Sequence, residues 1–237
     1  ASGILHSIQV FNKYPRITYL GLYKNEEEKQ NIKIVKKNGI KIAFVSFNQY
    51  VNGVTYQEKL PYMINFHEST MMENMKKARE NADIVIVSCH WGIEYDYYPN
   101  IFQKNMAKQL ADAGADVIIG THTHTLQDVE YIQRADGKRT LVAYSLGNFV
   151  SGMLEESCQL EGMLSFDIEK KKIKNVVFTP LVNYYTLTGK RERHDFSVYR
   201  LKDYTNKLVE EHGFPNLTIP YMKEEVKQKV KNIKIDM

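Results

Sequence analysis

This sequence contains little cysteine, no long apolar run and no strong excess of one charge. Its 237 residues include only two cysteines, Cys89 and Cys158, which excludes a disulfide framework. No apolar run reaches the roughly 18 residues that cross a bilayer, and no signal peptide is visible. The 32 basic and 28 acidic residues give a formal net charge of +4. This mixed surface is not the footprint of a nucleic-acid-binding protein, so we expect no nucleic-acid partner.

Internal repeats, low-complexity tracts and obvious linkers are also missing from the sequence. A length of 237 residues allows one large domain or two small ones. The chain begins at Ala1 rather than at methionine, so we expect a fragment, and the lack of a targeting segment does not fix its location.

The first third of the chain predicts helices around one clear hairpin. Apolar residues on one stripe indicate a helix over residues 3–13, and a short strand is expected at 17–20. The Asn38-Gly39 pair between two alternating runs predicts a hairpin over 33–45. Residues 68–80 follow a helical pattern, and His67 just before them is interpreted as a turn residue.

The middle third predicts a strand, a helix and a strand. Residues 83–89 and 116–120 are continuous apolar runs, as in strands that are buried on both faces. Between them lies a helix over 102–113 that ends at Gly114. This order is typical of a βαβ unit with parallel strands.

The last part of the chain predicts two more hairpins and two helices. One hairpin joins 128–134 to 139–145 through Asp136-Gly137, and the other joins 164–169 to 173–178 around a lysine-rich turn. Helices are expected near 199–211 and 221–232. Hairpins on both sides of a βαβ unit indicate an α/β protein with a mixed sheet, or two packed sheets with helices outside.

Three of the seven histidines follow the two strands of the βαβ unit. His90 ends the first strand, and His122 and His124 follow the second. Parallel neighbouring strands end at the same sheet edge, about 4.8 Å apart, so we expect the three rings to meet there. In an extended segment, residues 122 and 124 would face the same side. Three neutral imidazoles suit zinc, iron or manganese, and the bland alternative is a polar rim satisfied by backbone hydrogen bonds.

Other polar residues surround the three histidines in the sequence. Glu94 could bind a metal, act as a base, orient a histidine, or form only a surface ion pair. Asn148 follows another apolar strand and is either a site residue or a turn residue, and Gln127 and Thr121 add neutral polar groups. Trp91 is interpreted as structural. Cys89 should be a buried thiol, because neighbours on a strand point to opposite faces.

These residues resemble one known family in order and spacing. The matching segments are His90-Trp91-Gly92-Ile93-Glu94-Tyr95, Pro99 with Gln103, residues 114–127, and residues 144–149. They are similar to the CapA-type capsule-synthesis proteins, which are poly-γ-glutamate biosynthesis proteins. The resemblance is specific over residues 83–150 and weaker from residue 1 to about residue 200. From this resemblance we expect residues 1–237 to form a single domain with a C-terminal extension at about 200–237.

The family resembles calcineurin-type metallophosphoesterases, which implies a four-layer α-β-β-α sandwich with two metal ions at strand ends. By this resemblance His90, His122 and His124 are metal ligands for Mn, Fe or Zn, with Glu94 and Asn148 as assisting catalytic groups. Thr123 replaces a proline that often separates the two family histidines. The early family motifs, Gly-Asp, an Asn-Leu-Glu-like segment and Asn-Asn-His, do not occur in this sequence. We therefore expect a domain without its N-terminal strands and with an incomplete metal site.

Three functions follow from the resemblance. The favoured one is biosynthesis or export of capsule or poly-γ-glutamate, with the anionic polymer and other capsule-synthesis membrane proteins as partners. The alternatives are a metal-dependent phosphoesterase or polymer hydrolase, and a non-catalytic surface-binding module. Family members usually sit at the outer face of the bacterial membrane, held by an N-terminal segment that this chain would lack.

Overall fold

The computed structural model describes residues 2–49, 68–188 and 192–237. The expected turn at His67 lies outside these residues. The chain divides into two compact units, each assembled from three segments of the sequence. Unit 1 comprises residues 1–91, 106–118 and 133–140, and unit 2 comprises residues 92–105, 119–132 and 141–237. No helix of the described residues is long and apolar enough to span a membrane.

Unit 1 is built on a hairpin and a parallel strand. Strands β1 (Lys33–Lys37) and β2 (Ile40–Asn48) pair antiparallel around the Asn38-Gly39 turn, as the sequence predicts. Both turn residues have positive φ, at 51° and 78°, which is the requirement of a primed two-residue turn. Strand β3 (Ile84–His90) then pairs parallel with β2 along its whole length, so Asn48 lies beside His90.

Two helices of unit 1 form where the sequence predicts them. Helix α1 (Ser2–Phe11) buries Ile8, and helix α3 (Glu68–Asn81) packs on β2 and β3. Met71 and Met75 of α3 are fully buried, as are Ala43 and Val87 of the two strands. A short helix, α2 (Glu26–Gln30), is capped by the Asn25 side chain, which accepts from the backbone N–H of Glu28 at 2.9 Å.

The strand expected at residues 17–20 does not form. Tyr19 instead stacks on Phe11 of α1 with ring centroids 5.5 Å apart, and the Lys33 ammonium lies 5.6 Å from the Tyr19 ring centre. The Tyr19 side chain therefore packs against a helix and a cation rather than on one face of a sheet, and Ile17 is exposed. A short apolar run does not distinguish these outcomes.

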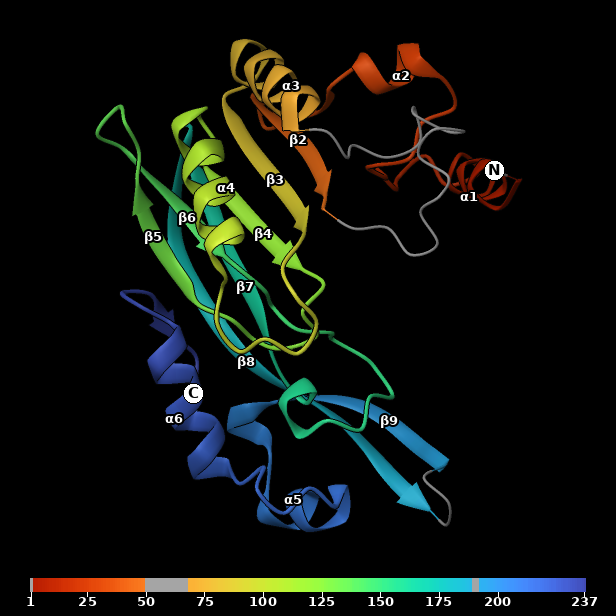
Figure 1. Ribbon diagram of the computed structural model, residues 1–237, viewed down its shortest axis with the longest axis vertical. Coiled ribbons are helices and arrows are strands. Elements are labelled where there is room, and N and C mark those ends of the chain that lie inside the picture. Colours follow the sequence, from red (N-terminus) through yellow and green to blue (C-terminus); the bar gives the residue numbers. More distant parts are fainter. Residues whose placement is uncertain (1, 50–67, 189–191) are drawn as a thin grey trace. The chain divides into compact units, whose positions relative to one another are not determined.

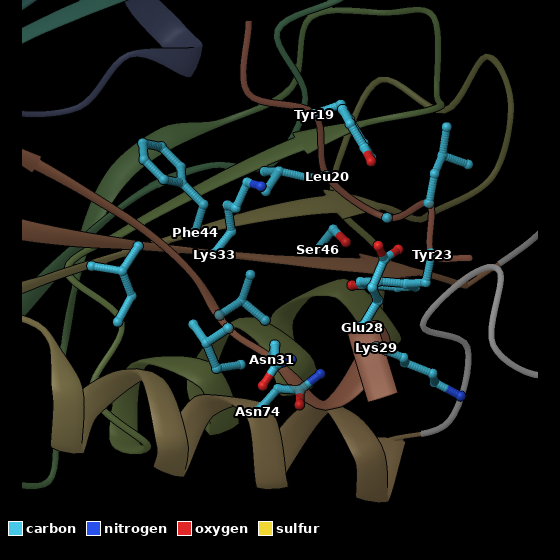
Figure 2. A pocket seen from close by; sticks show the side chains of 15 residues that line it. Tyr19, Leu20, Tyr23, Glu28, Lys29, Asn31, Lys33, Phe44, Ser46 and Asn74 are labelled. Atoms are coloured by element: carbon cyan, nitrogen blue, oxygen red, sulfur yellow. The ribbon is translucent and has the colours of Figure 1, made fainter. Parts of the chain in front are cut away.

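A cavity of about 400 Å³ lies in unit 1 beside the part of β2 that extends beyond its pairing with β1. In Figure 2, Asn74 rises into it from α3, Ser46 lines it from β2, and Tyr19 borders it from the irregular segment. None of the five predicted site residues lines this cavity.

Six strands form the first sheet in the order β1-β2-β3-β4-β6-β5 among the described residues. Its later members are β4 (Val117–Thr121), β5 (Val129–Gln133) and β6 (Arg139–Ala143), and helix α4 (Ile101–Asp112) connects β3 to β4. The βαβ segment and the Asp136-Gly137 hairpin therefore form where the sequence predicts them. The boundary between the units falls within α4 and these three strands.

A second sheet lies in unit 2 and centres on one long strand. Strand β8 (Lys172–Thr188) pairs antiparallel with β7 (Leu160–Glu169) and β9 (Glu192–Arg200), and parallel with the short β10 (Lys234–Ile235). The chain is thus an α/β protein with two mixed sheets, which confirms the predicted fold class. A 3-10 turn (Glu156–Cys158) precedes β7, and a second one (Leu201–Asp203) follows β9. Helices α5 (Asn206–His212) and α6 (Ile219–Lys229) come after it (Figure 1).

The helix expected at 199–211 begins later than predicted. Residues up to Arg200 belong to β9, because the exposed edge of β8 offers backbone partners as far as the Leu181–Arg200 pair. Helix α5 starts only after Thr205, whose side chain accepts from the backbone N–H of Leu208. Its start is therefore decided by a pairing partner that lies far away in sequence, and α6 agrees closely with the predicted last helix.

Candidate metal centre

A hairpin register brings His124 and Asn148 together. At the turn of the β5–β6 hairpin, the Arg134 N–H donates to the Lys138 carbonyl at 2.9 Å. Further out, the Gln127 N–H donates to the Ser145 carbonyl at 3.0 Å, and Leu126 bridges Leu146. The same antiparallel register, extended two residues, places position 124 opposite position 148.

Two hydrogen bonds lock the His124 and Asn148 side chains to each other. The Asn148 amide nitrogen donates to the His124 carbonyl at 3.3 Å and also faces the Met153 sulfur at 3.6 Å. Its oxygen must therefore accept from His124 Nδ1, at 2.6 Å. This assigns the proton of a neutral His124 to Nδ1 and leaves a lone pair on Nε2. Asn148 thus positions a histidine, which is the role that metal sites give to second partners of their ligands.

The lone pair of His124 faces a carboxylate. Nε2 lies 3.8 Å from Glu94 Oε1, and the two side chains are 31% and 47% exposed. Two electron-pair donors face each other here, and a proton, a water molecule or a cation between them would remove their repulsion. Two ligand bonds of about 2 Å each span up to about 4 Å, so the separation accommodates a metal ion. This pair would therefore supply only part of the coordination of the divalent cation that the family resemblance implies.

The backbone of this region is strained. His122 and His124 have φ values of 102° and 63°, so the segment after β4 is not extended as expected. Tyr95 and Phe149 also have positive φ, at 70° and 74°. The other six described non-glycine residues with positive φ lie at hairpin turns, strand irregularities or a helix end. Such strain costs about 1–3 kcal/mol per residue and clusters at functional sites.

The three predicted histidines are placed differently. The rings of His122 and His124 lie in unit 2 with centroids 6.3 Å apart. His90 ends β3 in unit 1, beside Asn48, so its approach to the other two stays a prediction. Within the ranges that the structure describes, no three His, Cys, Asp or Glu side chains form a group that could hold a metal ion.

The segment of residues 94–98, which we call the site loop, rests on buried side chains. The Tyr95 N–H donates to the Thr123 carbonyl at 2.8 Å, which ties the loop to the turn between the two histidines. Thr125 Oγ1 donates to the Asp96 carbonyl at 2.6 Å. Gln127 Nε2 donates to the carbonyls of Asp96 and Tyr98, at 3.0 and 3.1 Å. Gln127 is therefore a buried support of the loop rather than an exposed group of the site.

The chain that leads into the site loop requires glycine at position 92. Gly92 has φ +92°, and a Cβ atom there would lie 2.8 Å from the Gln103 side chain. Gln103 is itself fixed, because its amide donates to Gln127 Oε1 at 2.8 Å and its Oε1 accepts from the Asn100 N–H at 3.0 Å. The motif residues Gly92, Gln103 and Gln127 thus form one packed support beneath the loop.

One buried carboxylate escaped the sequence reasoning. Glu161 of β7 is fully buried, and its side chain packs against Gly147, beside the turn that carries Asn148. No donor within the described residues hydrogen-bonds either oxygen in good geometry. Burial raises the pKa of Glu161 to about 8, and the nearby backbone N–H groups of Phe149 and Asn148 only partly oppose this shift. Alternation along β7 places position 161 on the face whose later members are exposed, so the sequence pattern gave no signal of its burial.

Two interpretations about the first strand end are confirmed. Trp91 is fully buried, as expected of a structural residue. Cys89 is also fully buried, and burial raises the pKa of its thiol well above its usual range. Neither residue has the exposure that a reactive group needs.

Family comparison agrees with the matched motifs. The model of the family described as "Bacterial capsule synthesis protein PGA_cap" matches residues 1–153. The chain belongs to this family. All five predicted site residues lie in the matched part, whereas β7 to β10 and helices α5 and α6 follow it.

Two relatives are similar over the same part of the chain. The "Capsule biosynthesis protein CapA" of Bacillus anthracis is 34% identical over 155 residues, which cover 63% of this chain and 36% of that protein. The "PGA biosynthesis protein CapA" of Bacillus subtilis (strain 168) is 31% identical over 160 residues, which cover 67% and 41%. The matched region thus spans less than half the length of these relatives. A hypothetical protein from Thermus thermophilus is 13% identical with a TM-score of 0.31 over 71% of this chain and 60% of that one, too low to support any inference.

Proposed function

We propose that this protein acts in the biosynthesis or export of an anionic capsule polymer such as poly-γ-glutamate. Membership of the capsule-synthesis family and the names of the two CapA relatives support the proposal. Because those relatives are more than twice as long as the matched region, the activity of the whole protein is part of the proposal. So are its capsule-synthesis membrane partners and its place at the outer face of the membrane.

We also propose that the protein binds a divalent cation, which is Mn, Fe or Zn. His124 and Glu94 would hold it in unit 2, and His122 and His90 are further ligands only by the family resemblance. The observation that supports this most is the Asn148 contact, because it fixes the His124 lone pair toward Glu94 at 3.8 Å. A bound cation would neutralise negative charge on a carboxylate or phosphoryl oxygen.

The charge of Glu94 explains why a polyanion would need that cation. Without it, the half-exposed Glu94 carboxylate repels an approaching carboxylate of the polymer. When Glu94 and His124 share a cation, the same place attracts an anion. We therefore expect polymer binding to depend on both the cation and His124.

Calorimetric titration of the purified protein with MnCl₂ and ZnCl₂ tests the cation. His124→Ala should abolish the saturable binding, and Asn148→Ala should weaken it about 10- to 100-fold through loss of ring orientation. The matched control is His194→Ala, because His194 and Glu192 form a pair with the same 3.8 Å separation on exposed strand β9. If a proton rather than a metal bridges Glu94 and His124, wild-type protein will show no saturable binding.

Polymer binding and hydrolysis distinguish the functions. Poly-γ-glutamate retention that requires Mn²⁺ and is lost in His124→Ala supports the capsule proposal. Turnover on a panel of phosphodiesters that depends on His124 would replace it with the hydrolase alternative. Poly-γ-glutamate retention that depends on neither Mn²⁺ nor His124 would favour the non-catalytic surface-binding module.

A further inference from the structure

The site loop depends on a residue of the last helix. The carbonyls of Asp96 and Tyr98 accept from Thr125 and Gln127, but the carbonyl of Tyr97 between them accepts from Lys229 Nζ at 2.7 Å. Lys229 is the last residue of α6 and lies outside the part of the chain that matches the family.

Lys229 is buried in a way that is unusual for lysine. Only 3% of the residue is exposed, and its ammonium lies 4.5 Å from the Tyr98 ring centre and 5.6 Å from that of Tyr97. The nearest carboxylate, Glu225, is 4.0 Å away. A buried ammonium is costly unless it is well paired, and its partners on the loop supply part of that compensation beside the charges of Glu225 and Asp128.

The end of α6 is also held in register with the strand that follows the histidines. Val230 bridges Val129, and the Lys231 N–H donates to the Val129 carbonyl at 2.9 Å. Lys231 Nζ lies 2.7 Å from Asp128 Oδ2. Lys229 therefore reaches the loop from a helix end that is anchored two residues from Gln127.

We propose that Lys229 is a positioning residue that sets Glu94 against His124. The loop is held at Tyr95 by Thr123, next to His124, and at Tyr97 by Lys229. Glu94 directly precedes this segment, whose Asp96 and Tyr98 carbonyls are also held by Thr125 and Gln127. We expect loss of the Tyr97 contact to shift the loop and to move the carboxylate away from His124 Nε2. The inference rests on the proposed cation function of the same site.

The test compares Lys229→Met with Lys227→Met, because Lys227 is an exposed residue of the same helix. Lys229→Met should weaken Mn²⁺ binding at least tenfold in calorimetry, and Lys227→Met should leave it within twofold. Lys229→Arg should restore most of the affinity, since a guanidinium can donate to the Tyr97 carbonyl and stack on both rings. Val226→Ala, at a buried apolar position of α6, should lower the melting temperature without changing the affinity.

Lys229→Met that is folded and binds Mn²⁺ like wild type overturns the inference. Equal loss of affinity in Val226→Ala also overturns it, because the effect would then follow from stability alone. If wild-type protein binds no Mn²⁺, the cation function fails, and nitrogen-15 NMR of the imidazoles still tests the positioning. Unchanged His124 ring signals in metal-free Lys229→Met would then refute it.

Discussion

Strand β3 and the site loop follow each other in the sequence but are stabilised differently. The backbone of β3 pairs residue by residue with β2, from Ile42–Ile84 to Asn48–His90. The carbonyls of the loop instead accept from single side chains of Thr125, Gln127 and Lys229. The pairing of the strand therefore does not rely on the chemistry of single side chains, whereas the loop depends on a few polar residues far away in sequence.

Among the substitutions that test this dependence on single side chains, Gln127→Leu should lower the free energy of unfolding most. Leucine fills a similar volume but leaves Tyr98 and Gln103 without their Gln127 partner and Asp96 with Thr125 alone. At about 1–3 kcal/mol for each unsatisfied buried group, we expect a loss of about 4 kcal/mol in unfolding free energy. Urea denaturation measures it, with Gln133→Leu at an exposed position of β5 as the control. A loss below about 1 kcal/mol would show that water replaces the amide.

Gly92→Ala should have the next largest effect. Its positive φ and the Gln103 side chain 2.8 Å from a new Cβ together predict a loss of about 3 kcal/mol. Gly39→Ala is the control, because Gly39 has φ +78° but no atom within 4 Å of its Cβ position. We expect about 1 kcal/mol there, from the backbone alone. Equal losses in guanidinium denaturation would mean that the packing of Gln103 contributes nothing.

Glu161→Gln tests a buried side chain that, unlike those that support the site loop, has no strong hydrogen-bond partner. Its pKa is raised from 4.5 to about 8 in the folded state, so the folded protein binds this proton more tightly than the unfolded chain. The stabilisation is complete below about pH 4.5 and is lost as the pH rises through 8. Relative to Glu161→Gln, wild type should lose about 2 kcal/mol between roughly pH 6 and pH 8. Melting curves at both pH values test this, with Glu169→Gln on the same strand as the control. Parallel pH profiles of Glu161→Gln and wild type would contradict the expectation.

The turns show how much of the fold the sequence predicts. Asn38-Gly39 and Asp136-Gly137 are local signals of their hairpins, and both hairpins form. Lys170-Lys171 has no such signal, yet both lysines adopt positive φ, at 48° and 61°, because pairing of β7 with β8 imposes the turn. The predictions for 17–20 and 199–205 are wrong because Tyr19 packs on α1 and the β9 backbone pairs with β8 as far as Arg200, and no local pattern encodes either partner.

The candidate site was predictable to the same degree. The hairpin register around Asp136-Gly137, extended outward, places His124 opposite Asn148. The predicted hairpin ends at residues 128 and 145, so this pairing is not part of the prediction. The positive φ of both histidines was not predictable, because no local pattern marks it, and the residue between them is tied by its carbonyl to the N–H of Tyr95. Glu161 and Lys229 were missed, since burial of a charged residue depends on neighbours from other elements.

The sequence by itself determined the family, the α/β class, the main strands and helices, and the five candidate site residues. These follow from local periodicity, turn chemistry and motif spacing, which act over a few residues. Only the tertiary structure decided the tautomer of His124, its separation from Glu94, and the support of the site loop by Gln127 and Lys229. Those features depend on hydrogen bonds between segments up to 132 residues apart, because buried carbonyls must find donors wherever the fold brings them.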